Sequence, residues 1–362
     1  MSTVQQGDCA GTTASLFSCG GVSSLDDERR HGYLPDATFA EYLHLLSTQH
    51  PNLYRLLDKS RFQAKEGLAT LIGTTTEFDS DATGRGDSYR AAQEDTSVRW
   101  HGVQQLLRLA VPPGSGGKHT VLDVLGGDGT VARAHALHAG VGSEDLDVVT
   151  GDISGEMVRH ALARGLAAIR QAAQFSFLKS GSLDGVLLAY GTHHIPRADR
   201  SAAVSEAVRT VRTAGRVVLH DFDEASPMAR FFSEVVHTHS LAGHDYEHFT
   251  RTELHALFRT LPVLTQVLDL YDPIVVSGRT MDEARRGLCA YVGDMYGVRD
   301  LINAEHPDEG WALLEQHFDH TDYLARRKVV GAAVNVRAIE CEQGFIAELP
   351  RVAIVAVAQK HD

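Results

Sequence analysis

The fold is decided by the stretch from Val121 to Thr130, which reads VLDVLGGDGT. An apolar run that enters a glycine-rich turn is typical of a buried strand followed by a helix. Glycines there let the backbone approach a nucleotide-like ligand closely, and the first N–H groups of the helix can donate to it. No Lys-Ser or Lys-Thr pair follows, which argues against a phosphate-binding P-loop. Asp123, just before the glycines, favours a cationic ligand over a pyrophosphate.

Apolar runs and helical patterns alternate after this turn. We expect strands over 120–125, 147–150, 166–170, 183–190, 216–222, 263–271 and 351–359, and helices over 131–139, 154–164, 200–212 and 252–258. Strands that alternate with helices of this length indicate an α/β fold whose parallel strands are joined by right-handed crossovers.

The remaining segments surround this region. A linker, VPPGSGG over 111–117, cannot continue a helix and separates helical patterns at 34–71 and 89–109 from the sheet. The predicted divisions are a flexible N-terminal arm (1–32), a helical cap or lid (33–112), the ligand-binding core (118–280), a helical insertion (281–330) and the final strand or strands of the core (331–362).

Composition restricts the function classes. The chain has 362 residues, 43% of them hydrophobic and 22% charged, which is typical of a globular protein. A net charge of −13 argues against nucleic acid or an anionic membrane as the main partner. No apolar run is long enough to span a bilayer, no secretory signal pattern is visible, and the four cysteines show no metal-type spacing. We therefore expect a cytoplasmic protein.

Further motifs follow the glycine turn in a fixed order. They are GDISGEM at 151–157, SLDGV at 182–186, GTHHIP at 191–196 and VRTAGRVVLHD at 211–221. Over about 118–225, plus the last strand, the chain resembles the class I S-adenosylmethionine-dependent methyltransferases. The resemblance implies a Rossmann-like seven-stranded methyltransferase sheet, with an N-terminal helical cap and a helical insertion before the last strand. It also implies S-adenosyl-L-methionine as cofactor.

The resemblance also implies which residues hold the cofactor. Glycines 126, 127 and 129 would pass beneath its methionine part, Asp123 would lie near its ammonium group, and Asp152 would hold the ribose. The full implied set is Asp123, Gly126, Gly127, Gly129, Asp152, Ile153, Met157, Gln171 and Tyr190. Two departures from the family pattern, Leu125 in place of a glycine and Gln171 in place of an acid, leave open a non-catalytic protein that binds S-adenosylmethionine or S-adenosylhomocysteine.

Histidines are the candidate bases, since imidazole titrates near neutral pH. His193 and His194 follow the fourth strand, and His244 lies in the histidine-rich segment 237–248. Each also fits a structural role, as a hydrogen-bond partner of a loop. Imidazoles suit iron or zinc, but His237 and His239 at i and i+2 on a helix diverge, so we expect no metal.

Aromatic and histidine side chains outside the core could wall an acceptor pocket. The candidates are Tyr89, Trp100, His101, His239, Tyr246, Tyr291 and Tyr296. The sequence favours the alternative that the aromatic residues form a core or a homodimer interface.

The expected function is methylation of a small metabolite, a phenolic or aromatic amino-acid-like acceptor, at carbon or oxygen with a histidine base. Such chemistry belongs to specialised pathways such as antibiotic biosynthesis. The alternatives are metal-assisted C-methylation of a 2-oxo acid, in which an ion stabilises the enolate, and the non-catalytic protein.

Overall fold

The protein is described by a computed structural model over residues 32–63, 71, 76–82, 84–114, 116–140 and 145–362. The predicted N-terminal arm therefore lies almost entirely outside the described residues. No helix among the described residues is long and apolar enough to cross a membrane.

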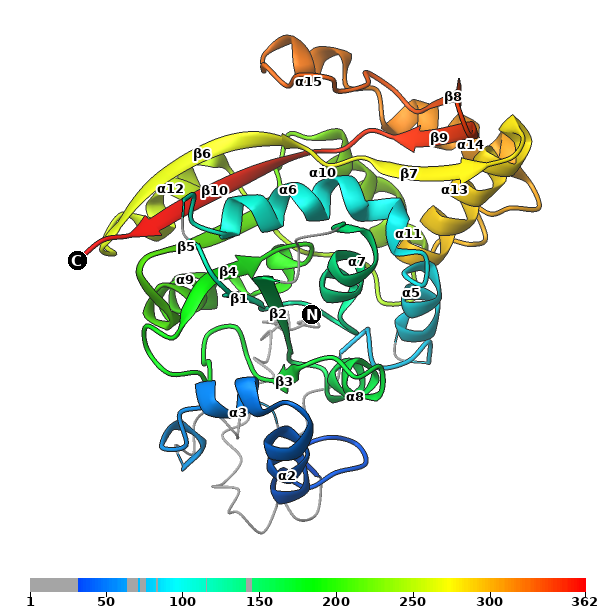
Figure 1. Ribbon diagram of the computed structural model, residues 1–362. Helices are drawn as coiled ribbons and strands as arrows, with labels where there is room; N and C mark the ends of the chain where they lie inside the picture. Colours follow the sequence, from blue (N-terminus) through cyan, green and yellow to red (C-terminus); the bar gives the residue numbers. More distant parts are fainter. Residues whose placement is uncertain (1–31, 64–70, 72–75, 83, 115, 141–144) are drawn as a thin grey trace, which may run out of the picture.

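A seven-stranded sheet forms the centre of the molecule, in the order β3-β2-β1-β4-β5-β10-β6 (Figure 1). The strands are β1 (His119–Asp123), β2 (Leu146–Asp152), β3 (Ala168–Arg170), β4 (Leu183–Leu188), β5 (Val211–Phe222), β6 (Val263–Tyr271) and β10 (Val352–Lys360). The first five run parallel, and β10 pairs antiparallel with both β5 and β6. The predicted seven-stranded α/β fold is confirmed.

Helices cover both faces of this sheet, and its central strands are therefore buried on both faces. On β1, Val121 faces one hydrophobic core and Leu122 faces the other. The first core also takes side chains from α6 (Trp100–Ala110) and α7 (Thr130–His138). The second takes side chains from α8 (Gly155–Ala163), α9 (Arg197–Thr210) and α12 (Arg251–Phe258). This two-sided burial explains why the strands read as continuous apolar runs.

The N-terminal helices lie in two places. Helices α2 (Phe39–Gln49) and α3 (Pro51–Leu56) lie near β3, where the Tyr42 hydroxyl donates to the Ala168 carbonyl at 2.9 Å (Figure 1). The helix predicted over 89–109 is instead α5 (Gly86–Ala92), a 3₁₀ turn (Thr96–Arg99) and α6, which packs on β4 and β5. Asp95 causes the break, because its side chain accepts from the Ser97 N–H and caps the new turn.

A second, three-stranded antiparallel sheet lies beyond the main one. It has the order β7 (Ile274–Gly278), β9 (Gly344–Leu349) and β8 (Arg337–Cys341). Helices α13 (Met281–Tyr296), α14 (Pro307–His317) and α15 (Thr321–Ala325) accompany it. The segment 331–362, predicted to hold the final strand or strands of the core, contributes β10 to the main sheet and β8 and β9 to this second sheet.

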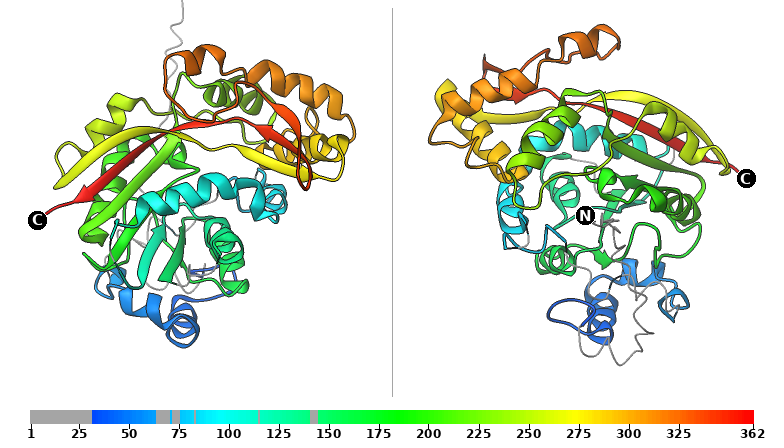
Figure 2. Two further views of the ribbon diagram at one scale, coloured as in Figure 1. Left: turned by 45° about the horizontal axis from the view of Figure 1, so that its top comes forward. Right: turned by 180° about the vertical axis from the view of Figure 1, so that it is seen from behind.

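The two sheets are joined by one long ribbon. Strand β6 continues into β7 and β9 into β10, with Pro273 at one junction and Pro350 at the other (Figure 2). Proline has no N–H to give to a ladder, so the regular pairing stops at both junctions. The chain then passes from one sheet to the other without a helix between them.

Candidate active site

The glycine turn after β1 requires glycine for two different reasons. Gly127 and Gly129 have φ angles of +57° and +89°, in the left-handed region that side chains disfavour. At Gly126 a Cβ atom would lie 2.8 Å from Thr150 Cγ2 and 2.9 Å from Asp123 Oδ2. The backbone therefore forms a close-fitting turn directly above a carboxylate.

Asp152, at the end of β2, fixes that turn. Its Oδ2 accepts from the Gly127 N–H at 2.9 Å, and its Oδ1 accepts from the Ser154 N–H at 2.8 Å. Burial raises the pKa of Asp152 to about 6, although these two N–H groups oppose the change. Each oxygen keeps a second lone pair for another donor.

Asp123 is the buried carboxylate beneath Gly126, with 2% of its surface exposed. Burial raises the pKa of Asp123 to about 7; the nearby Asp152 charge adds to this, and Arg99 opposes it. A carboxyl group in this state gains strongly from a cation brought close to it.

A cavity of about 320 Å³ opens above the turn. Its walls come from the turn, the end of β2, the residues after β4 and the loop before α5. They are Thr76, Glu77, Phe78, Tyr89, Leu125, Gly127, Asp152, Ile153, Met157, Tyr190, Gly191, His194 and Tyr246. This volume falls within the usual range for small-molecule sites. We call it the turn cavity.

A cluster of histidines lies beside the turn cavity. His193, in the 3₁₀ turn Thr192–His194 after β4, holds its Nδ1 3.0 Å from Asp221 Oδ2, and its backbone N–H donates to the same oxygen at 2.7 Å. His194 Nδ1 lies 3.5 Å from Glu77 Oε1. His244 stacks on Phe232 with ring centroids 4.2 Å apart, and both of its ring nitrogens are buried without a hydrogen-bond partner.

Burial keeps these imidazoles neutral. It lowers the pKa of His193, against the opposing charge of Asp221, and it lowers the pKa of His194 well below the ordinary value. Burial also lowers the pKa of His244 to about 2. Despite its own burial, the pKa of Asp221 is held well below its usual range by His193 and His248. The cluster therefore combines neutral bases with one ionised carboxylate.

A smaller cavity of about 40 Å³ adjoins the cluster; we call it the inner cavity. One of its walls is Tyr190, whose φ of +61° is unusual for a residue with a side chain. Both cavities are lined by Phe78, Tyr89, Tyr190 and His194. Only the inner cavity is lined by His193, Phe222, Phe232, Tyr296 and three arginines.

Comparison with known proteins fits this geometry. Residues 121–215 match the family model described as a methyltransferase domain. The chain is 30% identical over 114 residues to the ubiquinone/menaquinone biosynthesis C-methyltransferase UbiE of Rhizobium johnstonii, and this match covers 29% of the chain and 42% of that relative. The chain carries a class I S-adenosylmethionine-dependent methyltransferase domain.

Solved structures of similar fold have low sequence identity to this chain. YcgJ from Bacillus subtilis is 17% identical with a TM-score of 0.44, over 72% of this chain and 99% of its own. Phosphoethanolamine N-methyltransferase 2 of Haemonchus contortus, in complex with S-adenosyl-L-methionine, is 13% identical with a TM-score of 0.47. That match covers 80% of this chain and 61% of the other.

The residues of the methyltransferase domain fit S-adenosyl-L-methionine as the cofactor. The turn leaves no room for side chains at Gly126, and Asp152 has acceptor capacity for ribose hydroxyls. Gln171 Oε1 accepts from the Ser176 hydroxyl and the Phe177 N–H, each at 3.1 Å, while its Nε2 is buried without a partner. Only that amide nitrogen is left for a ligand, and it can only donate.

Some of the predicted cofactor residues line the turn cavity, and the others lie around or behind the glycine turn. Gly127, Asp152, Ile153, Met157 and Tyr190 line the turn cavity. Asp123, Gly126, Gly129 and Gln171 do not line it and lie around or behind the turn. Their roles toward the cofactor remain predictions.

Only some of the predicted acceptor residues lie at the two cavities. Tyr89, Tyr246 and Tyr296 line one or both cavities. Trp100 lies in a different groove with Leu107 and Pro112, His101 and His239 are exposed, and Tyr291 is buried without lining either cavity. These four are not brought to the site.

Several residues at the site carried no sequence signal. Glu77 and Phe78 lie in a stretch that reads only as a loop, and Arg85, Arg99 and Arg351 are single arginines on different elements. Nothing in their local spacing could have identified them.

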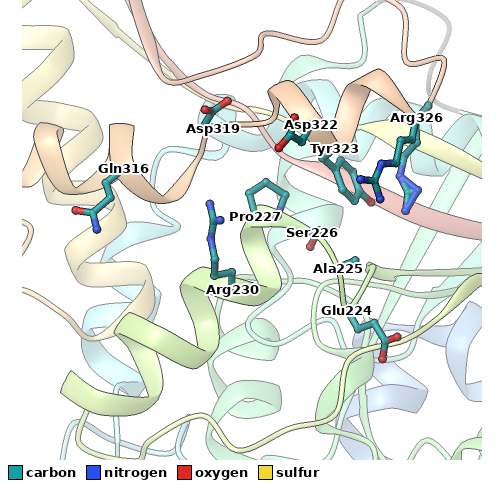
Figure 3. A pocket seen from close by; sticks show the side chains of 11 residues that line it. Glu224, Ala225, Ser226, Pro227, Arg230, Gln316, Asp319, Asp322, Tyr323 and Arg326 are labelled. Atoms are coloured by element: carbon teal, nitrogen blue, oxygen red, sulfur yellow. The ribbon is translucent and has the colours of Figure 1, made fainter.

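A further cavity, of about 550 Å³, lies between α10 (Pro227–Phe231) and the α14–α15 region (Figure 3). Its walls include Arg230, Asp319, Asp322 and Arg326. It shares no lining residue with the turn cavity or the inner cavity, and none of the predicted site residues lines it.

Proposed function

We propose that the protein methylates a small phenolic or aromatic amino-acid-like acceptor, at carbon or oxygen, with His193 as general base. The observation that carries this proposal is the buried His193–Asp221 pair at the inner cavity, beside the turn cavity. The bound cofactor supplies a methyl group already activated on a sulfonium. The protein therefore has to align the acceptor, exclude water and remove a proton.

Asp221 sets the direction of proton transfer. With the His193 Nδ1 proton directed at Asp221, Nε2 is the basic nitrogen. The lowered pKa of His193 keeps it unprotonated at neutral pH. Removing the proton of a phenol places negative charge on its oxygen and ortho carbons, which makes either atom a nucleophile.

Its contact with Asp221 favours His193 over His194 and His244 as the general base. His194 lies farther from its carboxylate partner, and His244 has no partner on either ring nitrogen. Of the three, only His193 has a short carboxylate contact among the described residues to stabilise its imidazolium, since His194 Nδ1 lies 3.5 Å from Glu77 Oε1 and His244 has no carboxylate within 4.0 Å.

The test is substitution of the pair. We expect His193→Gln and Asp221→Asn to lower turnover by about 10²- to 10⁴-fold, with S-adenosylhomocysteine affinity by calorimetry unchanged. The exposed His255 on α12 provides the control His255→Gln. Wild-type turnover in His193→Gln would remove His193 as the base. Binding of S-adenosylhomocysteine without transfer to any acceptor in a phenol and amino-acid panel would support the non-catalytic alternative.

A second candidate function uses the same cluster as a metal site. One ring nitrogen from each of His193, His194 and His244 lies within 4.8 Å of the others. Two of these histidines face carboxylates at Nδ1, an arrangement that metal-binding histidines often show. Such a site would support C-methylation of a 2-oxo acid. Retention of full activity after chelation, in protein without bound transition metal, would exclude it.

The remaining proposals concern the cellular location, the pathway and the oligomeric state of the protein. Cys289 and Cys341 are free thiols, which supports a reducing, cytoplasmic location. A role in a specialised pathway such as antibiotic biosynthesis follows from the proposed acceptor alone, and a homodimer stays a prediction.

A further inference from the structure

Three arginines line the inner cavity, and all of them are buried. Arg85, Arg99 and Arg351 are 6%, 6% and 2% exposed. They come from the N-terminal end of α5, from the turn before α6 and from the junction of β9 and β10. Because guanidinium groups stay charged, each needs compensation when it is removed from water.

Two of the three have a carboxylate partner. Arg85 Nε lies 2.9 Å from Glu77 Oε2, and its Nη1 donates to the Met295 carbonyl at 2.7 Å. Arg351 Nη2 lies 2.8 Å from Asp272 Oδ2, and its Nε donates to the Asp272 carbonyl at 2.9 Å. These two charges are neutralised inside the protein.

Arg99 differs from the other two. Across the described part of the chain, no carboxylate lies within 4.0 Å of its guanidinium. The one hydrogen bond that Arg99 makes to the described residues goes from Nη1 to Gln93 Oε1 at a long 3.5 Å, and its Nε is buried without a partner among them. The guanidinium stacks on Tyr190 at 3.7 Å from the ring centroid. The positive charge of Arg99 therefore has no directly bonded carboxylate at the inner cavity, and Asp272 and Asp123 act on it only from a longer distance.

We propose that Arg99 binds a carboxylate in the inner cavity, and that this carboxylate belongs to the methyl acceptor. The inference rests on the proposed function and narrows its acceptor to an aromatic acid. One unpaired cation calls for one negative charge, and the edge of a guanidinium matches a planar carboxylate. A volume of about 40 Å³ holds two or three waters or one such group.

The other source of a carboxylate is the methionine part of the cofactor. The position of Arg99 favours the acceptor, because Arg99 lines the inner cavity with His193 and does not line the turn cavity. The residues that line both cavities are mostly aromatic, so a ring attached to the carboxylate would lie between the arginine and the glycine turn.

The experiment measures binding without requiring transfer. Thermal melting of the full chain is followed with 3-(4-hydroxyphenyl)propanoate and with 4-ethylphenol, which lacks the carboxylate, in the presence of S-adenosylhomocysteine. The variants are Arg99→Gln and, as a control exposed on α6, Arg108→Gln. We expect the acid, and not the phenol, to raise the melting temperature of wild type and Arg108→Gln. Arg99→Gln should bind the acid about 10- to 100-fold more weakly.

Stability of the unliganded protein gives an independent readout. Arg99→Gln removes an unpaired buried charge, so it should melt at or above the wild-type temperature. Arg351→Gln removes the arginine partner of the buried Asp272 and leaves only the longer contacts from Tyr190 and His220, so it should melt lower. If Arg99→Gln melts as low as Arg351→Gln and the acid affinity is the same as in wild type, Arg99 is structural and the proposal is overturned.

Calorimetry separates the two sources. Loss of S-adenosylhomocysteine affinity in Arg99→Gln, with 5′-methylthioadenosine affinity kept, would assign the carboxylate to the cofactor and overturn the acceptor assignment. Unchanged affinity for both, with the acid lost, supports it. Acid binding at Arg99 in a protein that transfers no methyl group would sustain the site and reject the proposed function.

Discussion

Binding of S-adenosylhomocysteine should release protons near neutral pH, and Asp123→Asn should abolish the release. The pKa of Asp123 is raised to about 7, so close to half of the molecules carry a protonated Asp123 at pH 7. An ammonium group placed near this carboxyl, directly or through water, favours its ionised form. We therefore expect release of about 0.5 proton per ligand at pH 7.

The assay is calorimetry in two buffers of different ionisation enthalpy, such as phosphate and Tris. The slope of observed enthalpy against buffer enthalpy gives the number of protons released. Because asparagine has nearly the same shape as aspartate, Asp123→Asn should keep the fold, and a difference from wild type can be attributed to the lost carboxyl group. Equal observed enthalpies in the two buffers for the wild-type protein would show that no cation approaches Asp123, and the cofactor orientation would have to be revised.

The same carboxyl makes the unliganded protein less stable as pH rises. Its folded pKa of about 7 exceeds the ordinary 3.8, a difference of about 4 kcal/mol, so the folded state binds the proton more tightly. The free energy of unfolding should therefore fall between about pH 4 and pH 7. In Asp123→Asn that fall should be smaller, as measured by urea unfolding across this range.

Three other substitutions test separate parts of the site. Gly102→Ala should lower the free energy of unfolding by about 3 kcal/mol or more. The added Cβ would lie 1.6 Å from Asp272 Oδ1 and would displace this buried partner of Arg351. A midpoint of urea unfolding equal to that of wild type would show instead that α6 shifts to make room. Asp152→Ala should abolish S-adenosylhomocysteine binding by calorimetry, since the ribose partner and the acceptor for the Gly127 N–H are both lost; retained affinity would mean that the ribose lies elsewhere. His244→Ala should lower turnover while cofactor affinity stays constant, and equal turnover in both proteins would limit His244 to packing on Phe232.

Local pattern explains what the sequence could predict. The glycine turn, Asp152 and the alternating strands and helices are encoded within short stretches, because left-handed φ angles and two-sided burial each restrict residue type directly. The strand predicted at 263–271 is β6 itself.

The second sheet and the arginines depend on pairing through space. Strand β8 is mostly exposed, so no apolar run marks it, and the prolines at 273 and 350 both lie within a continuous ribbon. Arg99 differs from Arg85 and Arg351 because no carboxylate among the described residues lies within 4.0 Å of it, and no spacing along the chain reveals this difference.

The ribbon that joins the two sheets has a consequence for how acceptor preference can change. At its junction, the Asp272 N–H donates to the Arg351 carbonyl at 2.9 Å, and the two side chains form the ion pair beside it. Helix α13, which accompanies the second sheet, supplies Met295 and Tyr296 to the inner cavity, while the glycine turn follows the first parallel strand of the main sheet. Insertions beyond this junction would change the walls of the inner cavity, the proposed acceptor site, and leave the glycine turn unchanged, so selection can act on the two regions separately.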